Sequence, residues 1–150
     1  MTPYYGKLAA SKFLGASNAT SVSEIPLGSS AYQSAYAAYA GGQLDRVAVL
    51  NMYQFNSTST TARPSNLYSF SVGAALAGSK WQVERLTAPG SDVKTNVTFG
   101  GYAYEYSSLG KGVRPSGRGS CQDRTIQVGN DGVLSVSVQN SEAVVLSLVK

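Results

Sequence analysis

The chain has 150 residues, a formal net charge of +4 and only 13% charged residues, about half of the roughly 25% found in typical soluble domains. This length suits one domain, and a surface of uncharged polar residues is common in secreted β-rich proteins and argues against disorder. The absence of histidine excludes Ser-His-Asp and Cys-His catalysis, and the single Cys121 excludes an internal disulfide or a Cys-rich zinc site.

Residues 3–14 have the pattern of a helix. Pro3 suits the first helical position, because the N–H that proline lacks would have no partner there. Tyr5 and Phe13 fall on one face, with Ala9 midway between them, and Gly15 is expected to end the helix. The chain holds no run of about 18 apolar residues, so we expect no membrane span. The mild, scattered positive charge does not predict a nucleic-acid partner.

After this helix, the hydrophobic period changes to two, which predicts strands. The segment Tyr32–Tyr39 fits either a helix or a strand with a bulge at Tyr39, and we favour the strand. From the whole pattern we expect about eight short strands among nine candidate segments: 22–26, 32–39, 46–51, 67–72, 81–86, 97–106, 126–128, 133–138 and 143–149.

Glycine pairs divide these segments. Gly41-Gly42 predicts a turn, Gly100-Gly101 a bulge within one strand, and Asp131-Gly132 a hairpin that pairs 126–128 with 133–138. The sequence therefore predicts an all-β fold: a β-sandwich of about eight mostly antiparallel strands, preceded by one N-terminal helix, in a single domain over 1–150. The Gly-rich stretch 107–124 is long for a loop of a compact domain.

The acidic residues do not suggest a catalytic pair. Glycoside hydrolysis needs two carboxyl groups that face each other across the scissile bond. We assign three aspartates to turns and four glutamates to outward strand positions or strand starts, and no spacing recommends any two of them. The acids are Glu24, Asp45, Glu84, Asp92, Glu105, Asp123, Asp131 and Glu142, of which Asp45, Asp92 and Asp131 are the turn residues. We expect no catalytic residue, no metal site and no cofactor in this chain.

Two surface features leave alternatives open. The basic segment with Lys111, Arg114, Arg118 and Arg124 could hold an acidic polysaccharide through charge-assisted hydrogen bonds, although a solvated loop is the interpretation we favour. The ten tyrosines could form a stacking face for sugars or fill half-buried positions of a sheet, and the sequence does not separate these readings.

Three sequons, at Asn18, Asn56 and Asn96, favour a secreted glycoprotein. The first fifteen residues do not form a signal peptide, because Lys7 and Lys12 interrupt the stretch where an apolar core should lie. A secretion signal would then lie upstream, and we expect the chain to be part of a longer protein.

The order of segments resembles a known family over nearly the whole chain. A helix that opens with Pro3-Tyr4-Tyr5-Gly6 is followed by a tyrosine-rich strand, a Gly-Gly turn and a buried strand. The segments that match are YQSAYAAY (32–39), LDRVAVLN (44–51), VERLTAPG (83–90), NVTFGG (96–101) and the Asn130-Asp131-Gly132 turn. This order is similar to the C-terminal part of fungal glycoside hydrolase family 79, the β-glucuronidase and heparanase-like enzymes.

The resemblance implies a non-catalytic β-sandwich that supports a catalytic (β/α)₈ barrel. It implies retaining chemistry on two barrel glutamates, which lie outside this chain. Residues 1–16 would be the last barrel helix and residues 17–150 the sandwich. Tyr4 and Tyr5 would lie nearest the sugar site, although anchoring the helix is the role we favour. Without the barrel, this helix should dock poorly.

The main alternative function is a stand-alone carbohydrate-binding module for acidic or neutral glycans. An autonomous enzyme is the weakest hypothesis, because the chain lacks histidine and paired acids.

Overall fold

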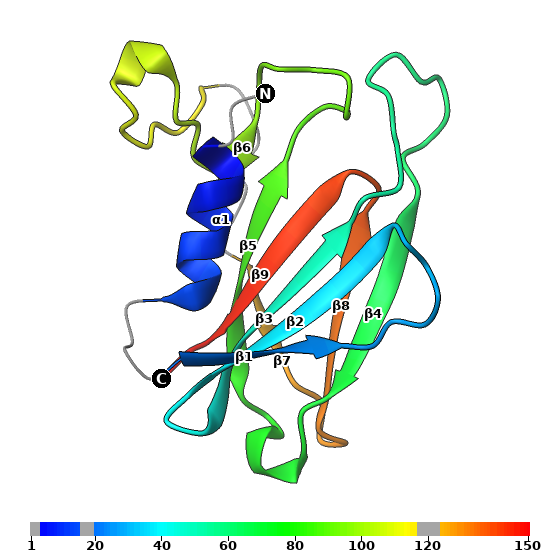
Figure 1. Cartoon of the computed structure of the whole chain (residues 1–150), viewed down its shortest axis with the longest axis vertical. Helices are drawn as coiled ribbons and strands as arrows, with labels where there is room; N and C mark the ends of the chain where they lie inside the picture. Colours follow the sequence, from blue (N-terminus) through cyan, green and yellow to red (C-terminus); the bar gives the residue numbers. More distant parts are fainter. Residues whose placement is uncertain (1–3, 16–19, 117–123) are drawn as a thin grey trace.

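The computed structural model describes residues 4–15, 20–116 and 124–150, which form one α-helix, two short 3₁₀ helices and nine strands (Figure 1). The expected all-β sandwich with a single N-terminal α-helix is confirmed. The elements are α1 (Tyr4–Leu14), β1 (Thr20–Ile25), β2 (Gln33–Ala40), β3 (Gln43–Asn51), β4 (Ser65–Ser71), η1 (Ala74–Leu76), β5 (Lys80–Thr87), β6 (Thr98–Phe99), η2 (Tyr106–Ser108), β7 (Arg124–Gln127), β8 (Val133–Gln139) and β9 (Glu142–Leu148).

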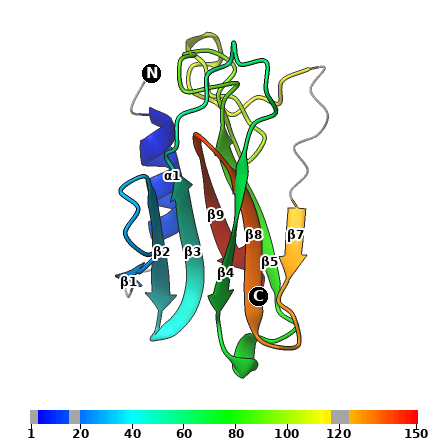
Figure 2. The same cartoon turned by 90° about the vertical axis from the view of Figure 1, so that its right-hand side faces the viewer.

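The strands form two antiparallel sheets of unequal size. The larger sheet has seven strands in the order β1-β2-β3-β9-β5-β6, and β7 also pairs with β5. The smaller sheet contains only β4 and β8. Figure 2 looks onto this smaller sheet and shows β2 and β3 of the larger sheet to one side of it. The smaller sheet therefore covers only part of one face of the larger sheet.

The main core lies between the two sheets. Alternation along β8 points Leu134, Val136 and Val138 inward, while Ser135 and Ser137 are exposed. These side chains meet Trp81, which is fully buried, and the inward residues of the central strands. The larger-sheet members of this core include Ala35, Val47, Val49, Val83, Val144 and Leu146.

The helix covers the opposite face of the larger sheet. Tyr5 and Phe13 are buried there against Ala38, Ala48 and Val145. The expectation that the helix docks poorly is therefore wrong for this face, although Tyr4 and Leu14 remain 42% and 48% exposed.

Gly15 ends the helix, as predicted. Its φ of 67° is the left-handed conformation that glycine adopts readily, and its N–H donates to the carbonyl of Ser11 at 2.9 Å. Arg46 from β3 donates to the carbonyl of Leu14 at 3.4 Å, so a cation satisfies the helix C-terminus.

The predicted β2–β3 hairpin is confirmed. Gly41 and Gly42 have φ values of 60° and 79°, the pair of positive angles that a type I′ turn requires. The favoured strand interpretation of residues 32–39 is also correct, and the register shifts between Ala38 and Tyr39, where a bulge was expected.

Two local expectations are wrong. The Asp131-Gly132 turn does not close a hairpin, because β7 pairs with β5 in the larger sheet while β8 pairs with β4 in the smaller one. The segment 97–106 is not one bulged strand. Gly100-Gly101 forms a tight reversal in which Phe99 and Tyr102 exchange both backbone hydrogen bonds, so β6 has only two residues.

Candidate functional site

The carboxylates of the described chain mostly have structural partners. Glu84 pairs with Lys12 at 3.1 Å, and Asp92 accepts hydrogen bonds from the N–H and hydroxyl of Ser57 at 2.8 and 2.9 Å. Asp131 accepts from the N–H of Val133 at 3.1 Å, which is its expected role in a turn. Glu24 and Glu105 are exposed, and Asp123 lies outside the described residues. Among the described residues, no group of three or more Asp, Glu, His or Cys side chains could hold a metal ion.

Two acids are placed differently from expectation. Asp45 is not in a turn but within β3, where it is buried and pairs with Arg46 at 2.9 Å and Lys150 at 3.0 Å. Glu142 starts β9, as one reading of the sequence allowed, but its side chain is buried rather than turned outward. Both are held by cations, so neither carboxylate faces an open site.

The N-terminal end of α1 meets the loop that follows β6. The hydroxyl of Tyr5 accepts a 2.7 Å hydrogen bond from the N–H of Tyr104, and the hydroxyl of Tyr4 donates to the carbonyl of Gly110 at 3.2 Å. The centroids of the Tyr4, Tyr5 and Tyr104 rings lie 5.9–6.0 Å apart; Tyr5 packs edge to face with the other two, which are tilted relative to each other. Burial raises the pKa of Tyr104, and the neighbouring Tyr4 and Glu84 raise it further. Tyr5 therefore anchors the helix.

Several large apolar side chains are exposed at this same end. Tyr106 is 95% exposed and Leu109 82% exposed, and both lie on the loop that Tyr4 contacts. Val113, at 52%, continues it, and we call these four residues (Tyr4, Tyr106, Leu109 and Val113) the α1 corner. Figure 1 shows this loop beside the start of α1. Beside it is a cavity of about 430 Å³, lined among others by Asn96, Glu105 and Val113. Exposed apolar groups in such number indicate an interaction surface.

Of the four cations of the basic segment, the structure describes the side chains of Lys111 and Arg114 only. Lys111 is exposed, and the guanidinium of exposed Arg114 lies 4.9 Å from the centroid of the Tyr102 ring. Arg118 and Cys121 lie outside the described residues, and Arg124 begins β7 with only its backbone described.

Two of the three sequon asparagines can be placed. Asn56 is exposed in the segment between β3 and β4, and Asn96 is exposed with a φ of 59° just before β6. Asn18 lies outside the described residues. Both placed side chains are at the surface, as glycan acceptors must be.

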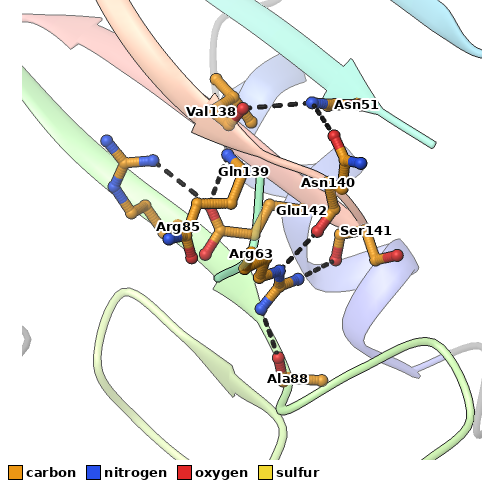
Figure 3. Close-up of polar contacts among 9 residues, drawn as sticks. All are labelled: Asn51, Arg63, Arg85, Ala88, Val138, Gln139, Asn140, Ser141 and Glu142. Carbon is orange, nitrogen blue, oxygen red and sulfur yellow. Dashed lines mark hydrogen bonds and ion pairs between the residues drawn. The ribbon is translucent and has the colours of Figure 1, made fainter. Parts of the chain in front are cut away.

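A polar corner joins the two sheets where β8 passes into β9 (Figure 3). The Arg63 guanidinium donates to three backbone carbonyls, those of Asn140 (2.6 Å), Ala88 (2.8 Å) and Ser141 (3.0 Å). It also lies 5.3 Å from the centroid of the Phe55 ring. Burial lowers the pKa of Arg63, and the nearby Glu142 carboxylate acts in the opposite direction.

The same corner contains a second set of hydrogen bonds. Glu142 accepts from the N–H of Gln139 at 3.2 Å and pairs with Arg85 at 3.4 Å, while the buried Asn51 amide donates to the carbonyl of Val138 at 3.1 Å. Sequence reasoning missed Arg63, because an arginine in a Ser/Thr-rich loop has the pattern of a solvated residue and its three acceptors are distant in sequence.

Comparison with known proteins adds family information. The family described as "Glycosyl hydrolase family 79 C-terminal beta domain" matches residues 35–145. A "Beta-glucuronidase" of Aspergillus niger is 36% identical over 97% of this chain, and a "Beta-glucuronidase" of Neurospora crassa is 33% identical over 69% of it. The aligned regions are 28% and 24% of those two proteins, so the chain spans about a quarter of its curated relatives.

A solved structure is also similar. It is described as a 4-O-α-L-rhamnosyl-β-D-glucuronidase from Fusarium oxysporum in a Rha-GlcA complex. It superimposes with a TM-score of 0.70 at 25% identity, covering 97% of this chain and 29% of that chain.

Proposed function

The chain belongs to the C-terminal β domains of glycosyl hydrolase family 79, and from this premise we propose that it supports the catalytic barrel of a secreted, β-glucuronidase-like enzyme. Its relatives are about four times longer than the aligned region, which leaves ample chain for such a barrel. In this proposal the barrel contributes both catalytic glutamates and hydrolyses the glycoside with retention of configuration. Five of the described carboxylates of this chain, Asp45, Glu84, Asp92, Asp131 and Glu142, have structural partners.

The α1 corner is the observation on which this proposal rests. Tyr106 and Leu109 are large apolar side chains that lie almost wholly in solvent, which is typical of a surface that a partner covers. Tyr4 hydrogen-bonds their loop to the helix. We propose that the barrel packs against this corner and that α1 is common to both domains. Tyr5 then fixes the helix to the sandwich, whereas Tyr4 faces the barrel side, nearer to the sugar site.

A chimera tests this proposal. In the Aspergillus niger β-glucuronidase, the region aligned with this chain is replaced by residues 1–150. We expect the chimera to hydrolyse an aryl-glucuronide, a version lacking the region to be unstable, and the isolated chain to be inactive. ¹H NMR of the first sugar released by the chimera should show the β anomer. Hydrolysis by the isolated chain, lost when one of its own acids is replaced, would overturn the proposal.

The docking surface has its own matched control. Tyr106→Ser and Leu109→Ser in the chimera should lower the melting temperature, because each exposes apolar surface on the barrel side. Val22→Ser on β1, where Val22 is 46% exposed, should not. Equal effects of all three substitutions would show that the α1 corner is not the interface.

Secretion and glycosylation are part of the same proposal. The exposed Asn56 and Asn96 sequons and the fungal relatives support it. Expression of the chimera through a fungal secretory pathway should give a glycosylated product, and Asn56→Gln and Asn96→Gln should each remove the mass of one glycan.

One observation favours the carbohydrate-binding alternative. The rings of Tyr32 and Tyr53 lie 5.3 Å apart and are 59% and 36% exposed, a surface on which a sugar ring could stack. Titration of the chain with a neutral glucan and with a polyglucuronate, each at two salt concentrations, separates the modes. Binding lost in Tyr32→Ala indicates stacking, whereas salt-sensitive binding lost in Arg114→Ala indicates the basic segment.

A further inference from the structure

We propose that the N-linked glycan of Asn96 is a structural part of this domain, with its first N-acetylglucosamine seated in the cavity of about 430 Å³ beside the α1 corner. There the sugar supports the loop on which Tyr106 and Leu109 lie. This inference rests on the glycosylation proposed above and deepens it, but it does not depend on the catalytic barrel.

The fold directs the sequon of Asn96 toward the cavity. Asn96 and Thr98 both line it, whereas Val97 between them is buried in the core beneath the helix, with Tyr5 and Phe13. Because Val97 and Thr98 are only 4% and 6% exposed, close packing leaves this segment little freedom to rotate. A sugar bonded to Asn96 therefore begins at the cavity wall.

The attachment is the ordinary reaction of secretory N-glycosylation. The Nδ2 atom of Asn96 bonds to C1 of N-acetylglucosamine, the bond from C1 to the diphosphate of a polyprenyl-linked oligosaccharide donor breaks, and the amide nitrogen loses one proton. The transferase acts on the chain before it folds, so the burial of Thr98 in the folded domain is no obstacle. The sugar is then in place when the loop folds over it.

The walls of the cavity suit N-acetylglucosamine. Ala103, Val113 and Pro115 present apolar surface to the C–H bonds of the ring and to the acetyl methyl group. The carboxylate of Glu105, on the same wall, can accept hydrogen bonds from the sugar hydroxyl groups. The volume falls within the range of about 300–1,000 Å³ that is typical of sites for small organic molecules. The outer sugars of the glycan continue into solvent.

The loop after β6 presents different sides to the cavity and to the solvent. Ser107 and Ser108 line the cavity, whereas Tyr106 and Leu109 do not line it and are 95% and 82% exposed. Val113 borders both the cavity and the α1 corner. Figure 1 shows this loop at the same end of the molecule as β6. A sugar in the cavity therefore supports the loop from behind and leaves the two side chains that we assign to barrel docking uncovered.

Few described contacts fix this loop to the rest of the domain. Ala103 and Val113 exchange two backbone hydrogen bonds of 2.9 Å across its base, and Tyr4 donates to the carbonyl of Gly110 farther along it. Several other hydrogen bonds stay within the loop. Because a segment held at few points opens locally, a sugar packed beneath it should reduce that opening.

Amide hydrogen exchange of the 150-residue chain provides the test. The chain is secreted from a fungal host behind an added signal peptide and trimmed with endoglycosidase H, which leaves one N-acetylglucosamine on each glycosylated asparagine. It is compared with the same chain made in bacteria, which carries no glycan. We expect the sugar to slow exchange at Ala103 and Val113 by about fivefold. Exchange at Val49 and Leu146, in the core between the sheets, should not change.

Matched variants separate the Asn96 sugar from that on Asn56, which is not on this cavity wall. In the secreted chain, Asn96→Gln should abolish the slower exchange and Asn56→Gln should retain it. Asn96 has a φ of 59°, which asparagine tolerates better than glutamine. The same Asn96→Gln change in the bacterial chain therefore measures the backbone strain alone, and this effect is subtracted. If the glutamine variant fails to fold, Asn96→Asp takes its place, because aspartate tolerates positive φ and accepts no glycan.

The outcomes separate this inference from the function proposed above. A mass spectrum that shows the sugar on Asn96, together with equal exchange at Ala103 and Val113 in the secreted and bacterial chains, would overturn the packed glycan and leave secretion and the barrel intact. Slower exchange that is lost in Asn96→Gln, together with an inactive chimera, would support the packed glycan and overturn the barrel. A secreted chain with no sugar on Asn96 would overturn this inference and the glycosylation proposed for that residue.

Discussion

The two faces of the seven-stranded sheet are covered in different ways. On the inner face, β4 and β8 bury an apolar core in which Trp81, Leu134 and Leu146 have no exposed surface. On the outer face, one helix covers the sheet with two buried aromatic residues, and two hydrogen bonds, from Tyr104 to Tyr5 and from Tyr4 to Gly110, secure its N-terminal end. The inner face is therefore held by packing spread over many residues, and the outer face by a few anchors. We expect the first to determine global stability and the second local order.

The largest effect is expected in the inner core. Leu134→Ala should lower the free energy of unfolding by about 2–5 kcal/mol, because it removes buried methyl groups and leaves a cavity. The matched control is Leu67→Ala on the partner strand, where the side chain is 71% exposed and the change should be within about 0.5 kcal/mol. Urea unfolding measures both. Similar losses for the two variants would contradict the core as described.

Arg63 comes next, because it holds the turn between β8 and β9 to the segment that follows β5. Arg63→Met should cost about 1–3 kcal/mol, since three carbonyls lose a charged donor. Arg63→Lys retains the charge but lacks the planar fork, so it should restore only part of the loss. Full recovery by lysine in thermal unfolding would show that charge, rather than geometry, is what matters.

The outer face should respond locally. Tyr5→Phe deletes the hydroxyl that accepts from Tyr104 and should cost about 1–2 kcal/mol, with faster amide exchange in α1 and at Tyr104 but not in β9. Tyr4→Phe is the control, because its hydroxyl bond to Gly110 is at the surface. Exchange that accelerates equally in β9 would show that the two faces unfold as one unit.

The smallest effect concerns Asp92, which is on neither face. Hydrogen bonds from Ser57 hold the pKa of Asp92 below its ordinary value. A depressed pKa contributes stability above the unfolded pKa of roughly 4, and that contribution is lost as the pH falls through the folded value. The melting temperature of the wild type should therefore decline slightly more than that of Asp92→Asn as the pH is lowered below about 4. Parallel pH profiles would contradict this.

The parts of the fold that are determined by residues close together in the sequence were predictable. Gly15 ends the helix and Gly41-Gly42 turns the chain because the required positive φ angles favour glycine at those positions. The Asp131-Gly132 turn shows the limit of this reasoning. Its residues specify a reversal, but the choice of sheet for β8 depends on the burial of Leu134 and Val136 against strands far away in sequence.

The helix anchor and the polar corner were less predictable, because their contacts join residues that are far apart in the sequence. The helix anchor joins Tyr5 to Tyr104, and the polar corner joins Arg63 to Ser141. Neither pair has a signature within a short window of sequence. The expected importance of Tyr4 and Tyr5 came from a family resemblance, whereas the difference between them, one buried and one at the surface, required the structure.

The position of β9 has a consequence for synthesis of the protein. This strand, the last of the nine described strands in sequence, lies between β3 and β5 and joins the two halves of the larger sheet. Until it leaves the ribosome, β3 and β5 each present an unpaired edge, and β3 contains the apolar run VAVL (47–50). The nascent domain should therefore depend on chaperones for longer than a protein whose neighbouring strands are made one after another.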